Sequence, residues 1–244
     1  MREKQTGKDC SNSSETRSAY TQAASAPQMI AEPDVALTDY GLFFESCLFC
    51  FWIHRRNRSH PLTRWFLLLF SSIALAAALG GTVHGFLTDP HSGVRIVVWY
   101  GTMILLGVTG LSEFGIAAHL LLPPRAARFL ILAAVGMFAL YLCAVLFWSA
   151  EFRIAILDYV VGLVFLCIAF VCTYLRTGVP SVALGAAGLL VSVLASRLQQ
   201  AHVSLHPRYF NHNALYHVLQ AVALFFIYRS ARALLMMPSP PQSK

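Results

Sequence analysis

Seven long apolar blocks follow a polar opening in this sequence. Residues 1–35 are rich in Ser, Thr, Gln, Lys and Glu and contain no apolar stretch like that of a signal peptide. Each later block approaches or exceeds the roughly 17–25 residues that a helix needs to cross a bilayer. Because a bilayer admits only helices and closed barrels, the pattern predicts an all-α fold, a seven-helix transmembrane bundle. The expected helices cover Leu37–Ile53, Leu62–Phe86, Val94–Leu121, Ala126–Trp148, Phe152–Leu175, Val179–Leu198 and Asn211–Met237.

The composition fits this fold and excludes an ordinary soluble domain. Apolar residues make up 57% of the 244 positions and charged residues 12%, whereas soluble domains have about 45–50% and about 25%. The polar segment 1–35 cannot bury enough apolar surface to fold, so it is predicted to be a disordered tail. A transmembrane domain over residues 36–237 and a short C-terminal tail over 238–244 complete the expected organisation.

The net charge is +7, and the distribution of the basic residues between the two sides determines the expected orientation. Arginines concentrate after the first helix, where Arg55, Arg56, Arg58 and Arg64 lie close together. Because positive residues favour the cytoplasmic side, the N-terminus is predicted to lie outside and the C-terminus in the cytoplasm. The same rule explains the excess of Lys and Arg over Asp and Glu, so nucleic acid is not expected as a partner. The expected location is the cell membrane, with membrane lipid as a partner.

Histidines gather on the side that is predicted to face outward. Because the second helix leaves the membrane where the seventh enters it, six of the nine histidines share this side: His84, His91, His202, His206, His212 and His217. His84 lies just inside the boundary, and His217 lies roughly 10 Å deep at about 1.5 Å per residue. Ionisable side chains at such depths usually face the interior of the bundle.

Imidazoles and carboxylates at one end of a bundle are ligands suited to zinc. Catalytic Zn²⁺ takes three protein ligands and leaves one position for water, whose pKa it lowers to about 7. The expected ligands are His84, His212 and His217, and His202 and His206 form a second candidate pair. Three carboxylates could orient a ligand or accept the proton of the water: Asp89, Asp158 and Glu45. The alternative is that these imidazoles form ordinary hydrogen bonds at the helix ends.

The spacing in the last helix constrains this hypothesis. Five residues turn a helix through about 500°, so His212 and His217 diverge by roughly 140°. Both can bind one ion if the helix begins at Asn213, which leaves His212 on the preceding loop. Asn211 or Asn213 is also suited to be the N-cap of this helix.

Glu113 stands apart from these groups, toward the inner half of the third helix. It could act as a proton-relay carboxylate, since ionisable groups inside a membrane often mark proton pathways. It could equally pair with an arginine at the inner boundary. Asp39, like Glu45, lies in the outer half of the first helix and is expected to face the bundle interior.

The segment GGTVHGF and the polar start of the last helix resemble the alkaline ceramidase superfamily, which includes the progestin/adiponectin receptors. Its members carry Ser-x-x-x-His in the second helix and an aspartate soon after. Three histidines hold zinc for the hydrolysis of lipid amides. In this resemblance His84 matches the histidine of the second helix, Gly80 occupies the serine position and Asp89 stands for the aspartate.

The last helix of that superfamily carries His-x-x-x-His. Here the corresponding pair begins with Asn213 and ends with His217, and His212 lies one position earlier. A closer resemblance links TDYGLFFE, GGTVHGF and HPRYFNHNALYHVLQAVAL to a family of uncharacterised seven-span membrane proteins. That resemblance covers the whole helical region and implies the topology rather than an activity.

These observations lead to two hypotheses of function. The first is an intramembrane zinc-dependent hydrolase of a lipid-like amide or ester, with Asp89 and Asp158 as its catalytic carboxylates. The second is a non-catalytic sensor, receptor or small transporter that uses the same outward cavity. Three imidazole nitrogens within about 2.0–2.1 Å of one point would favour zinc. A carboxylate-rich cavity that reaches Glu113 would favour transport, and polar groups simply paired across helices would favour a structural subunit.

Overall fold

A computed structural model describes residues 30–56, 58–206 and 209–237 of the chain. The described residues form seven α-helices and no strand, and all seven are long and apolar enough to cross a membrane. The predicted all-α, seven-helix fold is therefore confirmed. The helices are α2 Pro33–Arg56, α3 Pro61–Phe86, α4 Gly93–Leu121, α5 Pro124–Phe147, α6 Phe152–Thr177, α7 Pro180–Gln200 and α8 His212–Leu234.

Proline and glycine mark several of the helix boundaries. Pro61, Pro124 and Pro180 each stand at the first position of a helix. Proline suits this position because its φ is already helical and because the amide hydrogen that it lacks would have no partner in the helix. Gly178 ends α6 in the left-handed region, with φ 66°. A residue with a side chain is strained there, so glycine stops the helix at this point.

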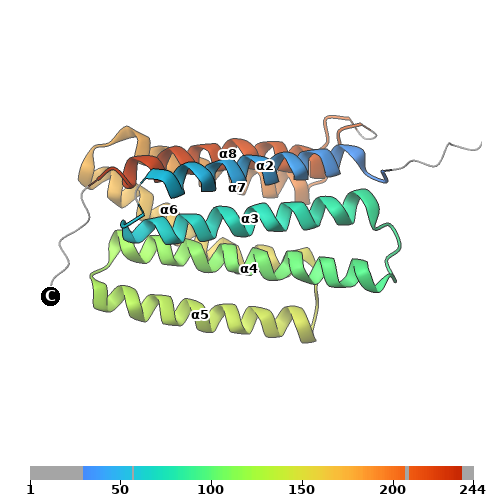
Figure 1. The fold of residues 1–244 in the computed structure, drawn as a ribbon, viewed down its shortest axis with the longest axis horizontal. Helices are drawn as coiled ribbons and strands as arrows, with labels where there is room; N and C mark the ends of the chain where they lie inside the picture. The colour runs from blue at the N-terminus through green and yellow to red at the C-terminus, as the bar shows by residue number, and fades with distance from the viewer. Residues whose placement is uncertain (1–29, 57, 207–208, 238–244) are drawn as a thin grey trace, which may run out of the picture.

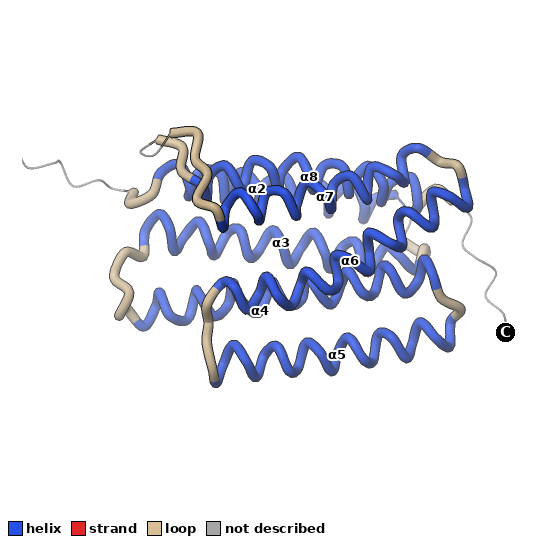
Figure 2. Tube along the Cα trace, turned by 180° about the vertical axis from the view of Figure 1, so that it is seen from behind, coloured by secondary structure: helices blue, strands red, loops and turns tan. Residues whose placement is uncertain are grey.

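Six helices form a closed ring, and α5 lies outside it. Neighbours around the ring touch in the order α2, α3, α4, α6, α7, α8 and back to α2. Helix α5 packs against α4 and touches α6 only slightly, so it occupies one edge of the molecule (Figures 1 and 2). Phe129, Leu140 and Phe147 of α5 are largely exposed. This helix therefore presents a broad apolar surface to lipid.

The two ends of the ring differ in their side chains. The histidine end is where α2 begins, α3 ends and α8 begins; the arginine end is where α2 and α8 end. Near the arginine end the interior is filled by aromatic rings, with Phe49 stacked on Tyr228 at 4.3 Å and edge-on to Phe70 at 5.3 Å. All three rings are buried. These rings therefore close the space that the ring of helices encloses at the arginine end.

Small residues allow the ring helices to approach one another closely. A Cβ atom added at Gly188 of α7 would lie 2.6 Å from the carbonyl oxygen of Ala223 in α8. A Cβ added at Gly81 of α3 would lie 3.0 Å from Asp39 Cβ in α2. Small residues at such crossings are typical of membrane helices, whose association depends on van der Waals packing. Gly81 and its sequence neighbour Gly80 both lie against Asp39 of α2.

The chain ends contribute a few residues to this domain. Helix α2 begins at Pro33, four residues before the predicted start at Leu37. The remainder of the predicted N-terminal tail, residues 1–29, and the predicted C-terminal tail, 238–244, lie outside the described residues. The orientation, with the histidine end outward and the arginine end in the cytoplasm, stays a prediction from the arginine distribution.

Candidate functional site

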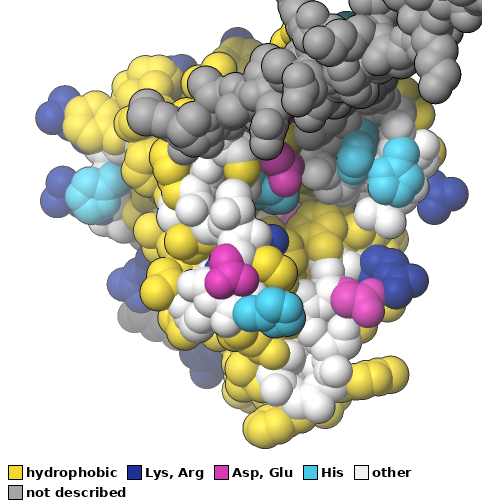
Figure 3. Space-filling view, turned by 90° about the vertical axis from the view of Figure 1, so that its right-hand side faces the viewer, with side chains coloured by type: hydrophobic (Ala, Val, Ile, Leu, Met, Phe, Trp, Pro, Cys, Tyr) yellow, Lys and Arg dark blue, Asp and Glu magenta, His cyan; other side chains and the backbone are white. Residues whose placement is uncertain are grey.

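A cavity of about 310 Å³ lies inside the ring of six helices. Every ring helix contributes side chains to its lining, and the peripheral helix α5 contributes none. Figure 3 looks onto the histidine end and shows histidine and acidic side chains gathered there. The lining includes Asp39, Leu42, Ile73, Gly80, His84, Leu106, Glu113, Tyr159, Leu166, Ser192, Gln199, Asn213, Tyr216, His217, Gln220, Leu224 and Ile227.

The cavity is polar at the histidine end and apolar below it. Asp39, His84 and His217 line the polar part, and the rest of the lining is mostly apolar, with leucine and isoleucine the most frequent residues. Along α8 the lining runs from Asn213 to Ile227, a distance of roughly 20 Å at about 1.5 Å per residue. No lysine or arginine of the described residues lines it. This division suits a molecule with a polar head and an apolar chain.

His217 and Asp39 form a buried pair in the polar part. His217 Nε2 lies 3.3 Å from Asp39 Oδ1, and the two residues are 9% and 5% exposed. On its other side, His217 Nδ1 lies 3.1 Å from the hydroxyl of Thr38. That hydroxyl donates its own hydrogen to backbone carbonyls of α2, so it accepts a hydrogen bond from Nδ1–H. Nε2 and Oδ1 must therefore share one further proton, because two lone pairs would otherwise face each other.

The second oxygen of Asp39 has no partner in the described part of the chain. Asp39 Oδ2 is buried and forms no hydrogen bond. A Cβ at Gly80, on the facing turn of α3, would lie 3.3 Å from it. A buried carboxylate oxygen without a donor is costly, so this atom marks a place where a ligand or water can donate a hydrogen bond.

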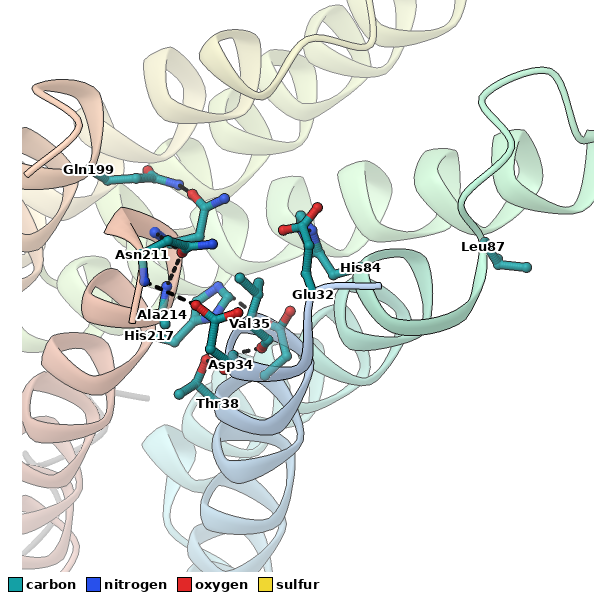
Figure 4. Close-up of polar contacts among 12 residues, drawn as sticks. Glu32, Asp34, Val35, Thr38, His84, Leu87, Gln199, Asn211, Ala214 and His217 are labelled. Atoms are coloured by element: carbon teal, nitrogen blue, oxygen red, sulfur yellow. Dashed lines mark hydrogen bonds and ion pairs between the residues drawn. The ribbon is translucent and has the colours of Figure 1, made fainter. Parts of the chain in front are cut away.

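His84 lies at the cavity entrance and contacts the start of α2. Its Nδ1 is 3.2 Å from Glu32 Oε2, and its backbone carbonyl accepts a bond from Glu32 N (Figure 4). Nearby, the backbone N–H of Asn211 donates a hydrogen bond to Asp34 Oδ2 at 2.9 Å. These contacts attach the start of α2 to the end of α3 and to the start of α8. They fix the rim around the cavity.

His212 faces away from this cavity. Its Nε2 lies 3.2 Å from His202 Nδ1, in the connection between α7 and α8, and it is not among the lining residues. The three predicted zinc ligands therefore have three different partners: Glu32 for His84, His202 for His212, and Asp39 for His217. Within the described ranges, no group of three His, Cys, Asp or Glu side chains is arranged to hold a metal ion. The zinc site stays a prediction.

The two predicted catalytic carboxylates lie outside the cavity. Asp89 is exposed in the connection between α3 and α4, where its Oδ1 accepts the amide of His91 at 2.9 Å. Asp158 of α6 faces α4, because a Cβ at Gly110 would lie 3.0 Å from its Oδ2. Among the described residues, neither Asp89 nor Asp158 is hydrogen-bonded or ion-paired to His84 or His217, and Glu45 does not line the cavity either. Their catalytic roles stay predictions.

Glu113 lines the apolar part of the cavity and is 5% exposed. Its Oε2 has no hydrogen-bond partner, and no arginine of the described residues forms an ion pair with it. A Cβ at Gly162 of α6 would lie 2.8 Å from Oε2, so the carboxyl group occupies the space that this glycine leaves. The cavity therefore joins the Asp39–His217 pair to a second buried acid.

Several polar cavity residues were not singled out by the sequence. Ser192 donates to Gln220 at 2.7 Å between α7 and α8, and Gln199 donates to Asn213 at 3.0 Å. Asn211 is the N-cap of α8, one of the two candidates that the sequence offered. Asn213 is thereby free to face the cavity. Amide side chains within apolar helices usually face the bundle interior, as ionisable side chains do. Their presence was the signal in the sequence that could have identified these residues.

Comparison with known proteins gives a family. No curated protein and no solved structure matches the chain. One family model, described as a family of unknown function (DUF6962), matches residues 35–236. The match runs through all seven helices and includes Asp39, His84, Glu113 and His217. The chain therefore belongs to the DUF6962 family of unknown function.

Proposed function

We propose that this integral membrane protein is a seven-span receptor or small transporter that binds one amphiphilic, lipid-like molecule inside its helix ring. The observation that supports the proposal is the cavity, which is polar at the histidine end and apolar over the depth below it. Its volume of about 310 Å³ lies at the lower end of the range of about 300–1,000 Å³ for ligand pockets.

The charges of the lining favour a head group that donates hydrogen bonds or carries a positive charge. Asp39 and Glu113 each present a buried carboxylate oxygen without a partner among the described residues. No lysine or arginine in the described lining neutralises them. An amine or hydroxyl head group supplies the missing donors, whereas a carboxylate or phosphate would add further acceptors beside oxygens that already lack a donor. We therefore expect amphiphilic amines and alcohols to bind better than fatty acids.

The experiment is a binding series on the purified protein in mild detergent. A long-chain amine, alcohol and carboxylic acid of equal chain length are titrated, and bound ligand is measured by thermal shift and by native mass spectrometry. Ala76→Phe fills the apolar part of the cavity, since Ala76 is a buried lining residue. Ala133→Phe is the matched control, because Ala133 is exposed on α5, away from the cavity.

We expect the amine and the alcohol to bind to the wild type and to Ala133→Phe, and to bind at least tenfold more weakly to Ala76→Phe. Asp39→Asn should reduce the preference for the amine while leaving the cavity open. Equal binding by the two phenylalanine variants would reject the cavity as the binding site. Preference for the carboxylic acid would reject the assignment of the head group.

A second candidate function is hydrolysis of a lipid-like amide or ester, as the ceramidase resemblance implies. The observation that favours it is the buried pair of His217 and Asp39, which shares a proton at the polar end of the cavity. In this function Asp39 accepts a proton from water through Oδ2, its oxygen without a partner among the described residues, and His217 holds the carboxyl group in place through the proton shared at Oδ1. The three predicted zinc ligands are not gathered in this arrangement, so no step is assigned to a metal.

Two measurements test the second candidate. Hydrolysis of long-chain amide and ester substrates is compared in the wild type, Asp39→Asn and His217→Asn, where both substitutions should abolish turnover without loss of helix content. Metal content is measured in the wild type and in His217→Ala. Near-zero metal in both would reject the zinc prediction, and an absence of turnover in the wild type would reject hydrolysis while leaving the binding proposal intact.

A further inference from the structure

A second concave surface lies between α2 and α8 at the arginine end. It encloses about 700 Å³ and includes four arginines, two from each helix: Arg55, Arg56, Arg229 and Arg232. The two pairs lie in or near the last turns of their helices. The two helices lie side by side (Figure 1). The four guanidinium groups therefore line one groove.

No carboxylate of the described residues forms an ion pair with these four arginines. The ion pairs among the described residues involve His84, Arg153 and His217, and none of the four groove arginines. Their observed neighbours are uncharged: Arg229 lies over the Phe225 ring at 6.0 Å and Arg232 over the Tyr228 ring at 5.8 Å. Four positive charges gathered without a negative one repel each other. An anion in the groove would relieve that repulsion and accept hydrogen bonds in the geometry that arginine favours.

Aromatic side chains continue the groove toward the bilayer interior. Trp52 precedes Arg56 by four residues and Phe225 precedes Arg229 by four, so each ring lies about one helical turn, or roughly 6 Å, deeper in the membrane. Trp52 is 47% exposed and Phe225 42% exposed. Tyr228 is buried beneath the groove and stacks on Phe49, which gives it a rigid base. Exposed aromatic rings at this level are suited to contact acyl chains.

We propose that this groove binds the phosphate head group of an anionic membrane lipid. The phosphate contacts the four arginines, and the acyl chains pass between Trp52 and Phe225 into the bilayer. Basic pockets between transmembrane helices bind such head groups on the cytoplasmic side, which is the predicted location of this end. The site is separate from the cavity, which opens toward the opposite end, so the inference does not depend on the proposed function.

The experiment compares lipid binding in two matched pairs of substitutions. Purified protein in detergent is titrated with phosphatidylglycerol and with phosphatidylcholine of the same acyl chains, and bound lipid is counted by native mass spectrometry. Arg229→Gln with Arg232→Gln removes two groove charges. Arg125→Gln with Arg128→Gln is the control, because this pair has the same spacing, is exposed and lies on the first turn of α5 at the same end.

We expect the wild type to retain phosphatidylglycerol in preference to phosphatidylcholine. Each arginine near the membrane surface contributes about a fivefold gain in affinity for an anionic lipid. The double substitution in the groove should therefore weaken phosphatidylglycerol binding by roughly thirtyfold. The control pair should change it by less than about threefold. Inorganic phosphate at millimolar concentration should not displace the lipid, since it lacks the chains that contact Trp52 and Phe225.

Three results would overturn the inference. Equal losses in the two substituted pairs would show general attraction by surface charge rather than a site. Equal retention of the two lipids by the wild type would show that the head group is not recognised. Displacement by inorganic phosphate would assign the groove to a soluble anion. Arg55→Gln with Arg56→Gln tests the same groove from α2, in case the α8 pair does not fold.

Discussion

Replacement of Gly188 by alanine tests how α7 and α8 build one wall of the cavity. The added Cβ would lie 2.6 Å from the carbonyl oxygen of Ala223 and 3.1 Å from Ile227 Cγ1. Ordinary contact begins at 3.4 Å, so α7 would have to move away from α8 by about 0.8 Å. Because the nearest atom belongs to the backbone, no side-chain rotation can relieve the contact. The movement would also strain the hydrogen bond between Ser192 and Gln220.

The magnitude follows from two opposing effects. Alanine stabilises a helix by about 0.8–1 kcal/mol relative to glycine, and overpacking costs about 1–3 kcal/mol. A contact this short with the backbone belongs in the upper part of the second range. We therefore expect Gly188→Ala to lower the free energy of unfolding by about 1–2 kcal/mol. For a chain of this length the corresponding fall in Tm is roughly 2–4 °C.

The assay is thermal unfolding of the purified protein in detergent, followed by circular dichroism. The control is Gly136→Ala on the peripheral helix α5, where an added Cβ would meet nothing within 4 Å. That variant keeps the gain in helix propensity without the contact, so its Tm should equal or exceed the wild-type value. A Gly188→Ala protein as stable as Gly136→Ala would refute the close packing of α7 on α8.

Three further predictions concern single contacts. Asn211→Ala removes the acceptor for two backbone amides at the start of α8 and should lower stability by about 0.5–2 kcal/mol in thermal unfolding, whereas Asn211→Ser retains the acceptor. Thr38→Val removes the acceptor for His217 Nδ1 and should cost about 1–3 kcal/mol; a valine variant as stable as the wild type would contradict the proton assignment in the His217–Asp39 pair. Burial, and next the positive charge of protonated His119, lower the pKa of His60 below its ordinary 6.5, and neutral His60 caps α3. Unfolded chains then bind more protons, so stability should fall as the pH drops below about 6.5, and His60→Asn should lose this dependence.

The helices could be predicted from the sequence because the bilayer imposes their length and their apolar character. The predicted Leu62–Phe86 and the observed Pro61–Phe86 differ by one residue, and the third helix differs equally little. The arrangement of the helices could not be predicted in the same way. After its two arginines helix α5 is apolar on every side, and its neighbours α4 and α6 are mostly apolar. Hydropathy does not separate a lipid-facing surface from a packed one. The position of α5 outside the ring therefore had no clear signal in the sequence.

The contacts of the polar residues depended on segments that hydropathy does not detect. Glu32 falls within the segment predicted as a tail, yet it contacts His84 and fixes the start of α2 against α3. Thr38 is unremarkable in the sequence, but its hydroxyl determines which nitrogen of His217 carries a hydrogen. Depth along a helix follows from counting residues, and so the common location of His84 and His217 could be predicted. The partner of each imidazole depends on its direction around the helix axis.

The last helix shows how direction around the axis decides the chemistry. A roughly 140° divergence between His212 and His217 applies only if both lie within the helix. Helix α8 begins at His212, with Asn211 as its N-cap, so the divergence does apply. His212 consequently faces His202, and His217 faces Asp39 inside the cavity. Joint zinc binding by these two histidines would require the first turn of α8 to unwind and Asn211 to give up both of its capping bonds, whereas ligand binding in the cavity requires no such change.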